Sequence, residues 1–214
     1  VARSLDAFAR RDDCEATIIN PIGVPLLALG RYAALQSAAV DDPDRPAPVY
    51  RPTYRLIPKV GGRLNPGAIV RAVLPLARRL HAERPFDIVD AQFFWPDGPA
   101  AAEIAAALNL PLSIKARGAD IHFWGGKPYA RQAMLAAADR ASRLLAVCGA
   151  LADDMAALGM ARDKVWVHYT GLDRDRFRPL QHTQLRNRIG SELGIVLPDD
   201  APVLATVGAL IPRK

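Results

Sequence analysis

The chain has 214 residues, of which 50% are hydrophobic and 23% are charged, and its formal net charge is +6 at pH 7. This length and apolar content are enough for one large α/β domain, or for one domain and a piece of another, and they exclude a disordered polypeptide. The basic residues are scattered, with no run of five and no interleaved aromatic stripe, so we expect no nucleic-acid partner.

Cysteine and histidine give no sign of a disulfide framework or a metal site. The two cysteines, Cys14 and Cys148, are far apart in apolar settings, and the four histidines show no metal-ligand spacing. We therefore expect no metal, no cofactor and a reducing, cytoplasmic location. The sequence also has no segment that is long and apolar enough to span a membrane.

The first sixty residues predict an incomplete start and a long irregular excursion. Residues 1–9 have the pattern of an amphipathic helix, so we expect that a preceding strand is missing. A strand is predicted at residues 16–19. Residues 22–62 contain several prolines and an acidic turn. They predict an excursion over the ligand-binding face, with a short helix near residues 29–38 and a short strand at 49–51.

The next segment predicts a helix, a strand and a second helix. Asn65 is the expected N-cap of a helix that has Pro66 at its first position and stops before Pro85. Residues 86–91 predict a strand, and residues 99–108 predict an Ala-rich helix.

Three aromatic residues, Phe93, Phe94 and Trp95, lie between that strand and that helix. An isolated aromatic run is more often part of a core. Here the position directly after a strand favours the wall of a pocket, followed at once by Asp97 and Gly98.

The stretch with the most chemical potential follows the next predicted strand, residues 112–116. A guanidinium, a glycine, a carboxylate and an imidazole occur within six positions, at Arg117, Gly118, Asp120 and His122. Because they follow the carboxyl end of a strand, they are the best candidates for a reaction centre. The alternative is an Arg–Asp pair on the surface beside a solvated histidine.

Residues 141–179 carry two predicted strands with a helix between them. The first strand breaks at Cys148-Gly149, the helix closes at Gly159, and the second strand ends at Thr170-Gly171. Ligands of open parallel sheets bind outside the carboxyl ends of the strands, so both breaks are expected at the functional edge.

The end of the chain predicts the start of another domain. Residues 183–193 have a helical pattern, residues 197–202 have the composition of a linker, and residues 203–207 predict a strand. We expect three parts: a first domain at residues 1–180, a helix and linker at 181–202, and the first strand of a truncated second domain at 203–214.

The segment from Ala141 to Pro179 resembles retaining GT-B glycosyltransferases of family 4. The family pattern reads approximately A-x-x, a hydrophobic run and A-V-S-x-A-L, then L-x-x-L-G, K-V-x-V and N-G-V-D-x-x-x-F-R-P. This chain has Cys148 where Ser is usual and Thr170 where Asn is usual.

Two other segments add to the resemblance. F-x-x-P-D-G-x-A-A from Phe93 and A-R-G-x-D-I from Ala116 are similar to one branch of the family, in which many members have His where Arg117 stands. Gly208 to Lys214 resembles the family's V-G-R-L-x-x-x-K loop, whose basic residues meet the donor diphosphate, although Ala209 replaces the usual arginine.

The resemblance implies a Rossmann-like, doubly wound, mainly parallel α/β sheet that forms one half of a GT-B fold. It implies transfer of a sugar, with retention, from a nucleotide diphosphate sugar donor to a glycan or lipid-linked hydroxyl acceptor by a hexosyltransferase-type enzyme. The fragment alone is expected to be inactive. On the matching positions the implied roles are catalytic for Arg117 and Asp120; acceptor-binding for Asp97, Gly98, Gly118 and His122; and donor-binding for Gly171, Gly208, Arg213 and Lys214.

Two other functions stay open, namely a non-catalytic Rossmann-like binding module and a nucleotide-sugar epimerase of the same architecture. Asp173-Arg174-Asp175 matches a D-x-D metal signature, but Asp173 is better placed to cap a short helical turn, so no metal is predicted there. The basic charge and the lipid-linked acceptors of the family imply peripheral association with the inner face of a membrane.

Overall fold

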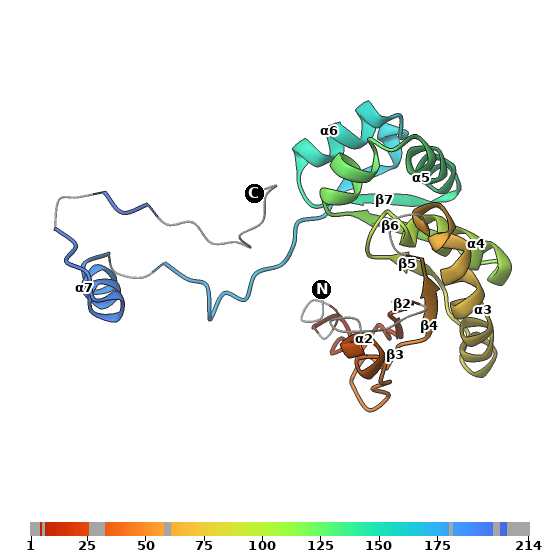
Figure 1. Ribbon diagram of the computed structural model, residues 1–214, viewed down its shortest axis with the longest axis horizontal. Helices are drawn as coiled ribbons and strands as arrows, with labels where there is room; N and C mark the ends of the chain where they lie inside the picture. The colour runs from red at the N-terminus through yellow and green to blue at the C-terminus, as the bar shows by residue number, and fades with distance from the viewer. Residues whose placement is uncertain are drawn as a thin grey trace. The chain divides into compact units, whose positions relative to one another are not determined.

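The chain divides into two compact units, residues 1–171 and residues 172–214. The predicted first-domain limit at residue 180 stays a prediction. A computed structural model of the chain (Figure 1) describes residues 5, 7–25, 33–57, 61–179, 182–198 and 202–204.

The first unit is built on a four-stranded parallel sheet in which sequence order and spatial order coincide. Helices connect successive strands, as parallel pairing requires. The strands are β5 (Val89–Ala91), β6 (Leu112–Ala116), β7 (Arg143–Ala146) and β8 (Val165–Val167), and the helices between them are α4 (Asp97–Leu108), α5 (Pro128–Arg140) and α6 (Gly149–Leu158). The α/β fold class and its parallel sheet are confirmed.

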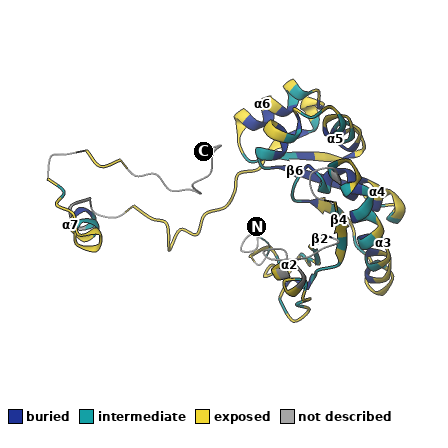
Figure 2. Ribbon diagram, in the orientation of Figure 1, coloured by how far each residue is buried: buried dark blue, intermediate teal, exposed yellow. Residues whose placement is uncertain are grey.

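The main hydrophobic core lies where these helices pack against the sheet. Leu112, Ile114 and Ala116 alternate along β6 and join one buried cluster with Met134 of α5 and Met155 of α6. Figure 2 shows the buried residues concentrated in β6 and in the inner faces of the helices. Since this core fixes β6, it also fixes the loop that follows β6.

The side chains on the other face of β5 and β6 are polar. Ser113 and Lys115 are buried although they are hydrophilic, and Ser113 donates a hydrogen bond to the carboxylate of Asp90 in β5. The register pairs Asp90 with Ser113 directly. This part of the sheet therefore has an apolar face and a polar face.

The proline-rich segment contains more strand than the sequence predicts. The strand at residue 49 is confirmed, but the excursion also forms two strands that were missed. Prolines lack an N–H group but still accept hydrogen bonds: the N–H of Ile18 donates to Pro48 and that of Ile22 donates to Pro52. The result is two parallel pairs, β1 (Ile18–Ile19) with β3 (Val49–Tyr50) and β2 (Ile22–Pro25) with β4 (Thr53–Leu56).

One helix lies within this segment and a second helix follows it. The short α2 (Ala33–Ser37) lies within the predicted helical range. The long α3 (Asn65–Glu83) stops before Pro85 as predicted, but Asn65 is its first helical residue and not its N-cap. The 3-10 turn Gly61–Leu64 runs directly into α3, so Leu64 occupies the cap position.

A π-helical turn, η3 (Asp120–Trp124), follows β6. The N–H of Gly125 donates to the carbonyls of both Asp120 and Ile121, at 3.1 and 3.0 Å. Gly125 is required here because a Cβ would lie 2.2 Å from the Ile121 carbonyl oxygen. Single π-helical turns occur frequently at functional sites.

The second unit contains α7 (His182–Leu193), which confirms the predicted helix. Before it, the Asp173 carboxylate accepts a hydrogen bond from the Arg176 N–H at 3.2 Å, which confirms that Asp173 caps a turn. The predicted final strand begins at residues 203–204, which are not in a strand, and its remainder lies outside the described residues.

Candidate functional site

Arg117 is held in place by the loop that follows the neighbouring strand. Its Nε donates to the carbonyl oxygen of Gln92, and its Nη2 donates to Oε1 of the same residue, both at 2.7 Å. The two residues follow β6 and β5 at the same edge of the sheet. Arg117 is half-buried, and these two hydrogen bonds fix its guanidinium.

Asp120 has no exposed surface and fastens the same two loops together. Its carboxylate accepts hydrogen bonds from the backbone N–H groups of Phe94 at 2.9 Å, Arg117 at 3.0 Å and Ile121 at 3.2 Å. Hydrogen bonds to an ionised acceptor are stronger than neutral ones. This geometry is that of a residue that positions the loops, and its predicted catalytic role stays a prediction.

Asp97 and Gly98 lie in the first turn of α4. Burial, with a smaller contribution from the negative charge of Asp120, raises the pKa of the Asp97 carboxyl to about 6. Burial and the Asp97 charge in turn raise the pKa of Tyr54 in β4. Gly98 is buried, and a Cβ on it would lie 3.3 Å from the Phe94 side chain, which would have to shift slightly to accept it.

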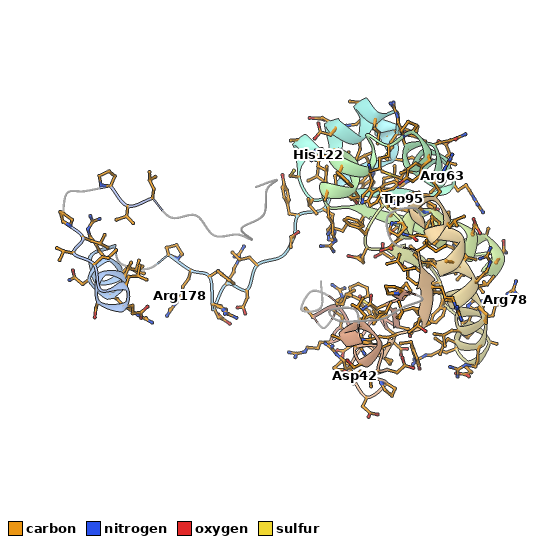
Figure 3. The ribbon with its side chains drawn as sticks, in the orientation of Figure 1. Asp42, Arg63, Arg78, Trp95, His122 and Arg178 are labelled. Carbon is orange, nitrogen blue, oxygen red and sulfur yellow. The ribbon has the colours of Figure 1, made fainter. Side chains whose placement is uncertain are left out.

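Gly118 and His122 lie on either side of Asp120 in the chain. Gly118 has φ +106°, a conformation that residues with a side chain rarely adopt. His122, labelled in Figure 3, is exposed and its Nε2 lies 2.9 Å from Oδ2 of Asp154 on α6. The imidazole therefore links η3 to α6 at the surface.

Sequence reasoning missed a second polar contact at this edge. Nζ of Lys115 lies 2.9 Å from Nδ1 of His168, which follows β8, although the two are 53 residues apart in the sequence. Burial lowers the pKa of Lys115, Arg117 lowers it further, and Asp90 opposes both. The alternation Ser113, Lys115, Arg117 was the available signal, since residues two apart share a face of a strand.

Three of the four predicted donor-binding residues are not described by the structure, and the fourth is Gly171. Gly171 is exposed, with open space around its Cα, at the end of the first unit. Gly208, Arg213 and Lys214 lie outside the described residues. Nothing therefore tests these four predictions.

The described part of the chain has neither a candidate metal cluster nor a membrane-spanning helix. No group of three or more histidine, cysteine, aspartate and glutamate side chains there is placed to hold a metal ion. Among the same residues, no helix has both the length and the apolar character needed to cross a membrane.

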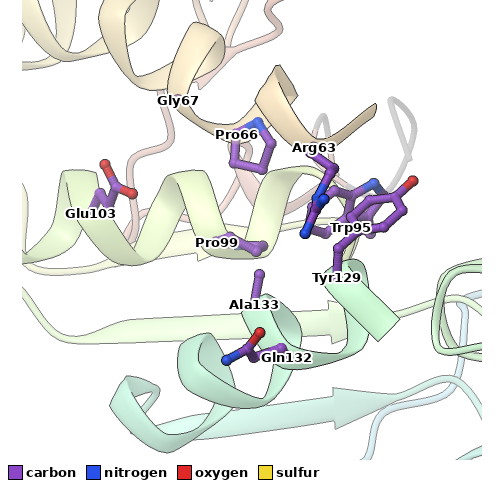
Figure 4. A pocket seen from close by; sticks show the side chains of 9 residues that line it. All are labelled: Arg63, Pro66, Gly67, Trp95, Pro99, Glu103, Tyr129, Gln132 and Ala133. Atoms are coloured by element: carbon purple, nitrogen blue, oxygen red, sulfur yellow. The ribbon is translucent and has the colours of Figure 1, made fainter. Parts of the chain in front are cut away.

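Residues of the aromatic run after β5 lie both in the core and in the wall of a cavity, the two positions considered from the sequence. Phe94 and Trp95 are 0% and 2% exposed and belong to the main core. Trp95 also lines a cavity together with residues of α3, α4 and α5, shown in Figure 4.

A parallel sheet with connecting helices, and with fixed polar groups at the carboxyl ends of its strands, defines a Rossmann-like domain of the kind that forms half of a GT-B fold. Residues 25–176 match the sequence model of Glycosyltransferase Family 4, and the chain belongs to this family.

One sequence relative and two solved structures illustrate the match. The chain is 28% identical over 174 residues to TuaC of Bacillus subtilis (strain 168), which carries the provisional name of a teichuronic acid biosynthesis glycosyltransferase; the match covers 78% of this chain and 41% of TuaC. Anabaena Alr3699/HepE in complex with UDP shares 16% identity at a TM-score of 0.53, covering 85% of this chain and 50% of HepE. The complex of HepE with UDP-glucose shares 16% identity at a TM-score of 0.52, and the match covers 83% of this chain and 50% of HepE.

The two HepE structures support the fold alone, because the identities are low. The chain spans half or less of the length of these relatives.

Proposed function

We propose that this chain forms the acceptor-side wall of a glycosyltransferase cleft. The enzyme would transfer a hexose-type sugar, with retention, from a nucleotide diphosphate sugar to a hydroxyl of a glycan or lipid-linked acceptor. Membership of Glycosyltransferase Family 4 supports the reaction class. The UDP and UDP-glucose in the HepE complexes support a nucleotide sugar as the donor.

The observation that carries the proposal is the fixed cation at the sheet edge. Arg117 is bonded twice to Gln92, and Asp120 bonds the backbone of both loops. A cation held in advance stabilises charge that develops in a transition state without reorganising during the reaction. Arg117 would therefore bind the diphosphate or an acceptor oxygen, and Asp120 would position it.

The surrounding residues supply the acceptor contacts of the proposal. A carboxyl with a pKa of about 6, at Asp97, is suited to accept a hydrogen bond or a proton from an acceptor hydroxyl near neutral pH. Gly118 has no side chain to keep a ligand away from the loop backbone, and the exposed His122 would contact the acceptor. Gly98, the next residue after Asp97, would contribute to the same acceptor contacts.

The donor contacts are proposed for Gly171, Gly208, Arg213 and Lys214, together with chain beyond these 214 residues. The 214 residues alone would then bind an acceptor without transferring a sugar. Turnover by this chain alone would contradict the division of roles.

Transfer from radiolabelled UDP-glucose, assayed with the complete gene product, tests the reaction. Arg117→Ala should lower kcat by about 10²-fold, the usual effect of removing one fixed transition-state contact. Arg117→Lys, which keeps the charge but loses the planar fork, should recover part of the rate. The anomeric coupling in the product's proton NMR spectrum tests retention, and an inverted product would refute it.

We also propose a cytoplasmic enzyme that associates with the inner face of a membrane when its acceptor is lipid-linked. The net charge of +6 supports attraction to anionic lipid. Binding to vesicles should increase with their anionic lipid content. Binding that ignores this content would contradict the association.

A further inference from the structure

A cavity of about 310 Å³ opens at the N-terminal ends of α3, α4 and α5 (Figure 4). Neither Arg117 nor Asp120 lines it, and neither Asp97 nor His122 does. The cavity therefore has a lining of its own, although Trp95 and Pro99 each lie two positions from Asp97 in the chain. The residues that decide its chemistry are Arg63, Trp95, Glu103, Tyr129 and Gln132.

A continuous row of aromatic rings leads from solvent to this cavity. Phe123 is 56% exposed and contacts Trp124, with ring centroids 5.1 Å apart. Trp124 lies 6.0 Å from Trp95, and Trp95 lies 5.6 Å from Tyr129. We call these four residues the aromatic row. Its outer end projects from η3, and its inner end is part of the cavity wall.

Polar groups surround the inner end of the row. The Arg63 guanidinium lies 5.5 Å from the centre of the Tyr129 ring, and Glu103 and Gln132 are exposed on α4 and α5. Nε1 of Trp95 is buried and has no hydrogen-bond partner in the described part of the chain. The cavity thus combines flat apolar walls with the donors and acceptors of Arg63, Glu103 and Gln132.

We propose that the cavity and the aromatic row form a saccharide-binding site separate from the reacting cleft. A sugar ring has an apolar C–H face that packs on an aromatic ring, and a rim of hydroxyls that both donate and accept hydrogen bonds. Arg63, Glu103 and Gln132 supply both kinds of partner. The volume lies at the lower end of the range of small-molecule pockets, which fits one sugar ring.

Charge at the cavity rim favours a saccharide over a nucleotide. A diphosphate would meet the Glu103 carboxylate as well as Arg63, whereas neutral hydroxyls bond to both. Outside the cavity, Nζ of Lys127 lies 4.7 Å from the centre of the Phe123 ring and 5.9 Å from that of Trp124, so further sugars of a chain would meet these rings together with one cation. Saccharide binding at this site needs neither the sugar donor nor turnover, so it can be tested independently of the proposed transfer reaction.

NMR titration of the ¹⁵N-labelled 214-residue chain with glucose, N-acetylglucosamine and maltotriose tests the proposal. The chain has three tryptophans, and each indole N–H is a separate reporter. We expect the signals of Trp95 and Trp124 to shift, and that of Trp166 in β8 to stay unchanged. The absence of any shift with all three sugars would overturn the proposal. A shift of the Trp95 signal with uridine alone would overturn it in favour of a nucleotide site.

A variant that fills the cavity separates specific binding from unfolding. A Cβ on Gly67, in the first turn of α3, would meet no atom within 4 Å, so Gly67→Leu can enter the cavity while α3 is kept. Gly67→Leu should weaken saccharide binding at least tenfold without lowering the melting temperature. Arg63→Ala should also weaken it. Ala107→Leu, on the exposed side of α4, is the control and should bind normally.

Arg117→Ala distinguishes this site from the cleft. Saccharide shifts at Trp95 should persist in Arg117→Ala even if that variant transfers no sugar. Loss of those shifts in Arg117→Ala, or their persistence in Gly67→Leu, would refute a separate site in this cavity.

Discussion

Asp120→Asn keeps the volume of a buried side chain but removes its charge and one of its two acceptor oxygens. In the native chain the N–H groups of Phe94, Arg117 and Ile121 all donate to this carboxylate. Asparagine can accept through one oxygen only, and its NH₂ group would face a backbone N–H. At least one buried N–H would then lose its acceptor, and the remaining bonds would lose their ionic component.

The size of the effect follows from these contacts. A hydrogen bond to a charged group contributes roughly 1.5–3 kcal/mol, and an unsatisfied buried donor costs about 1–3 kcal/mol. Asp120→Asn should therefore lower the free energy of unfolding by roughly 3–4 kcal/mol. For a domain of this size the melting temperature should fall by about 10 °C.

Thermal denaturation followed by circular dichroism measures the loss, and amide hydrogen exchange localises it. The Phe94 and Arg117 amides should exchange much faster in the variant. Asp154→Asn, which alters an exposed carboxylate bonded to His122, is the control and should change stability by less than about 0.5 kcal/mol. If Asp120→Asn melts with the parent and keeps its amides protected, while transfer by the complete gene product is lost, the positioning role is refuted and a catalytic role is favoured.

Three further substitutions test the electrostatics and the backbone. Because the pKa of Asp97 is raised to about 6, the folded chain retains a proton between about pH 4 and 6 that the unfolded chain releases, so stability falls as pH rises through this window. Asp97→Asn should therefore raise the melting temperature at pH 7.5 but not at pH 4. Equal effects at the two pH values would contradict the raised pKa. Gly118→Ala should cost about 1–2 kcal/mol in urea unfolding because φ is +106°, whereas no loss would mean that the loop relaxes freely. Because the pKa of Lys115 is lowered, the folded chain binds fewer protons than the unfolded chain at alkaline pH. The urea concentration at the unfolding midpoint should therefore rise toward pH 10 in the parent but not in Lys115→Met. A rise in both proteins would exclude Lys115 as the source of the pH dependence.

Much of the central fold could be predicted because its signals are local. The helix that ends at Gly159 does so with a left-handed glycine at φ +113°, and α3 stops before a proline, as both residue types dictate. The five residues of β6 alternate between apolar and polar side chains, as a strand does, and Gly118 follows one residue after Arg117. Such features depend on neighbours in sequence, so a single sequence contains them.

The paired strands of the proline-rich segment could not be predicted in this way. Ile22 pairs with Thr53, which is 31 positions away, and the decisive hydrogen bond uses a proline carbonyl. Proline content signals the missing N–H group but not the use of the carbonyl. Pairing across that distance is determined by packing, which periodicity does not encode.

The sequence indicates where the candidate residues lie in the fold but not which groups they contact. The sequence placed Arg117 and Asp120 after β6, yet their partners Gln92 and Phe94 belong to the preceding strand's loop, some 25 positions away. Whether a carboxylate faces a ligand or a backbone amide depends on such partners. A residue's chemical type therefore makes it a candidate, and the fold determines which groups its side chain contacts.

A double-mutant cycle on Gln92 and Arg117 tests the central claim most directly. The quantity measured is kcat/KM for sugar transfer from UDP-glucose by the complete gene product. If Gln92 acts by holding Arg117, Gln92→Ala should lower kcat/KM in the parent and have almost no further effect in Arg117→Ala. Losses that simply multiply would show that the two residues act independently, and would contradict a fixed cation at this edge of the sheet.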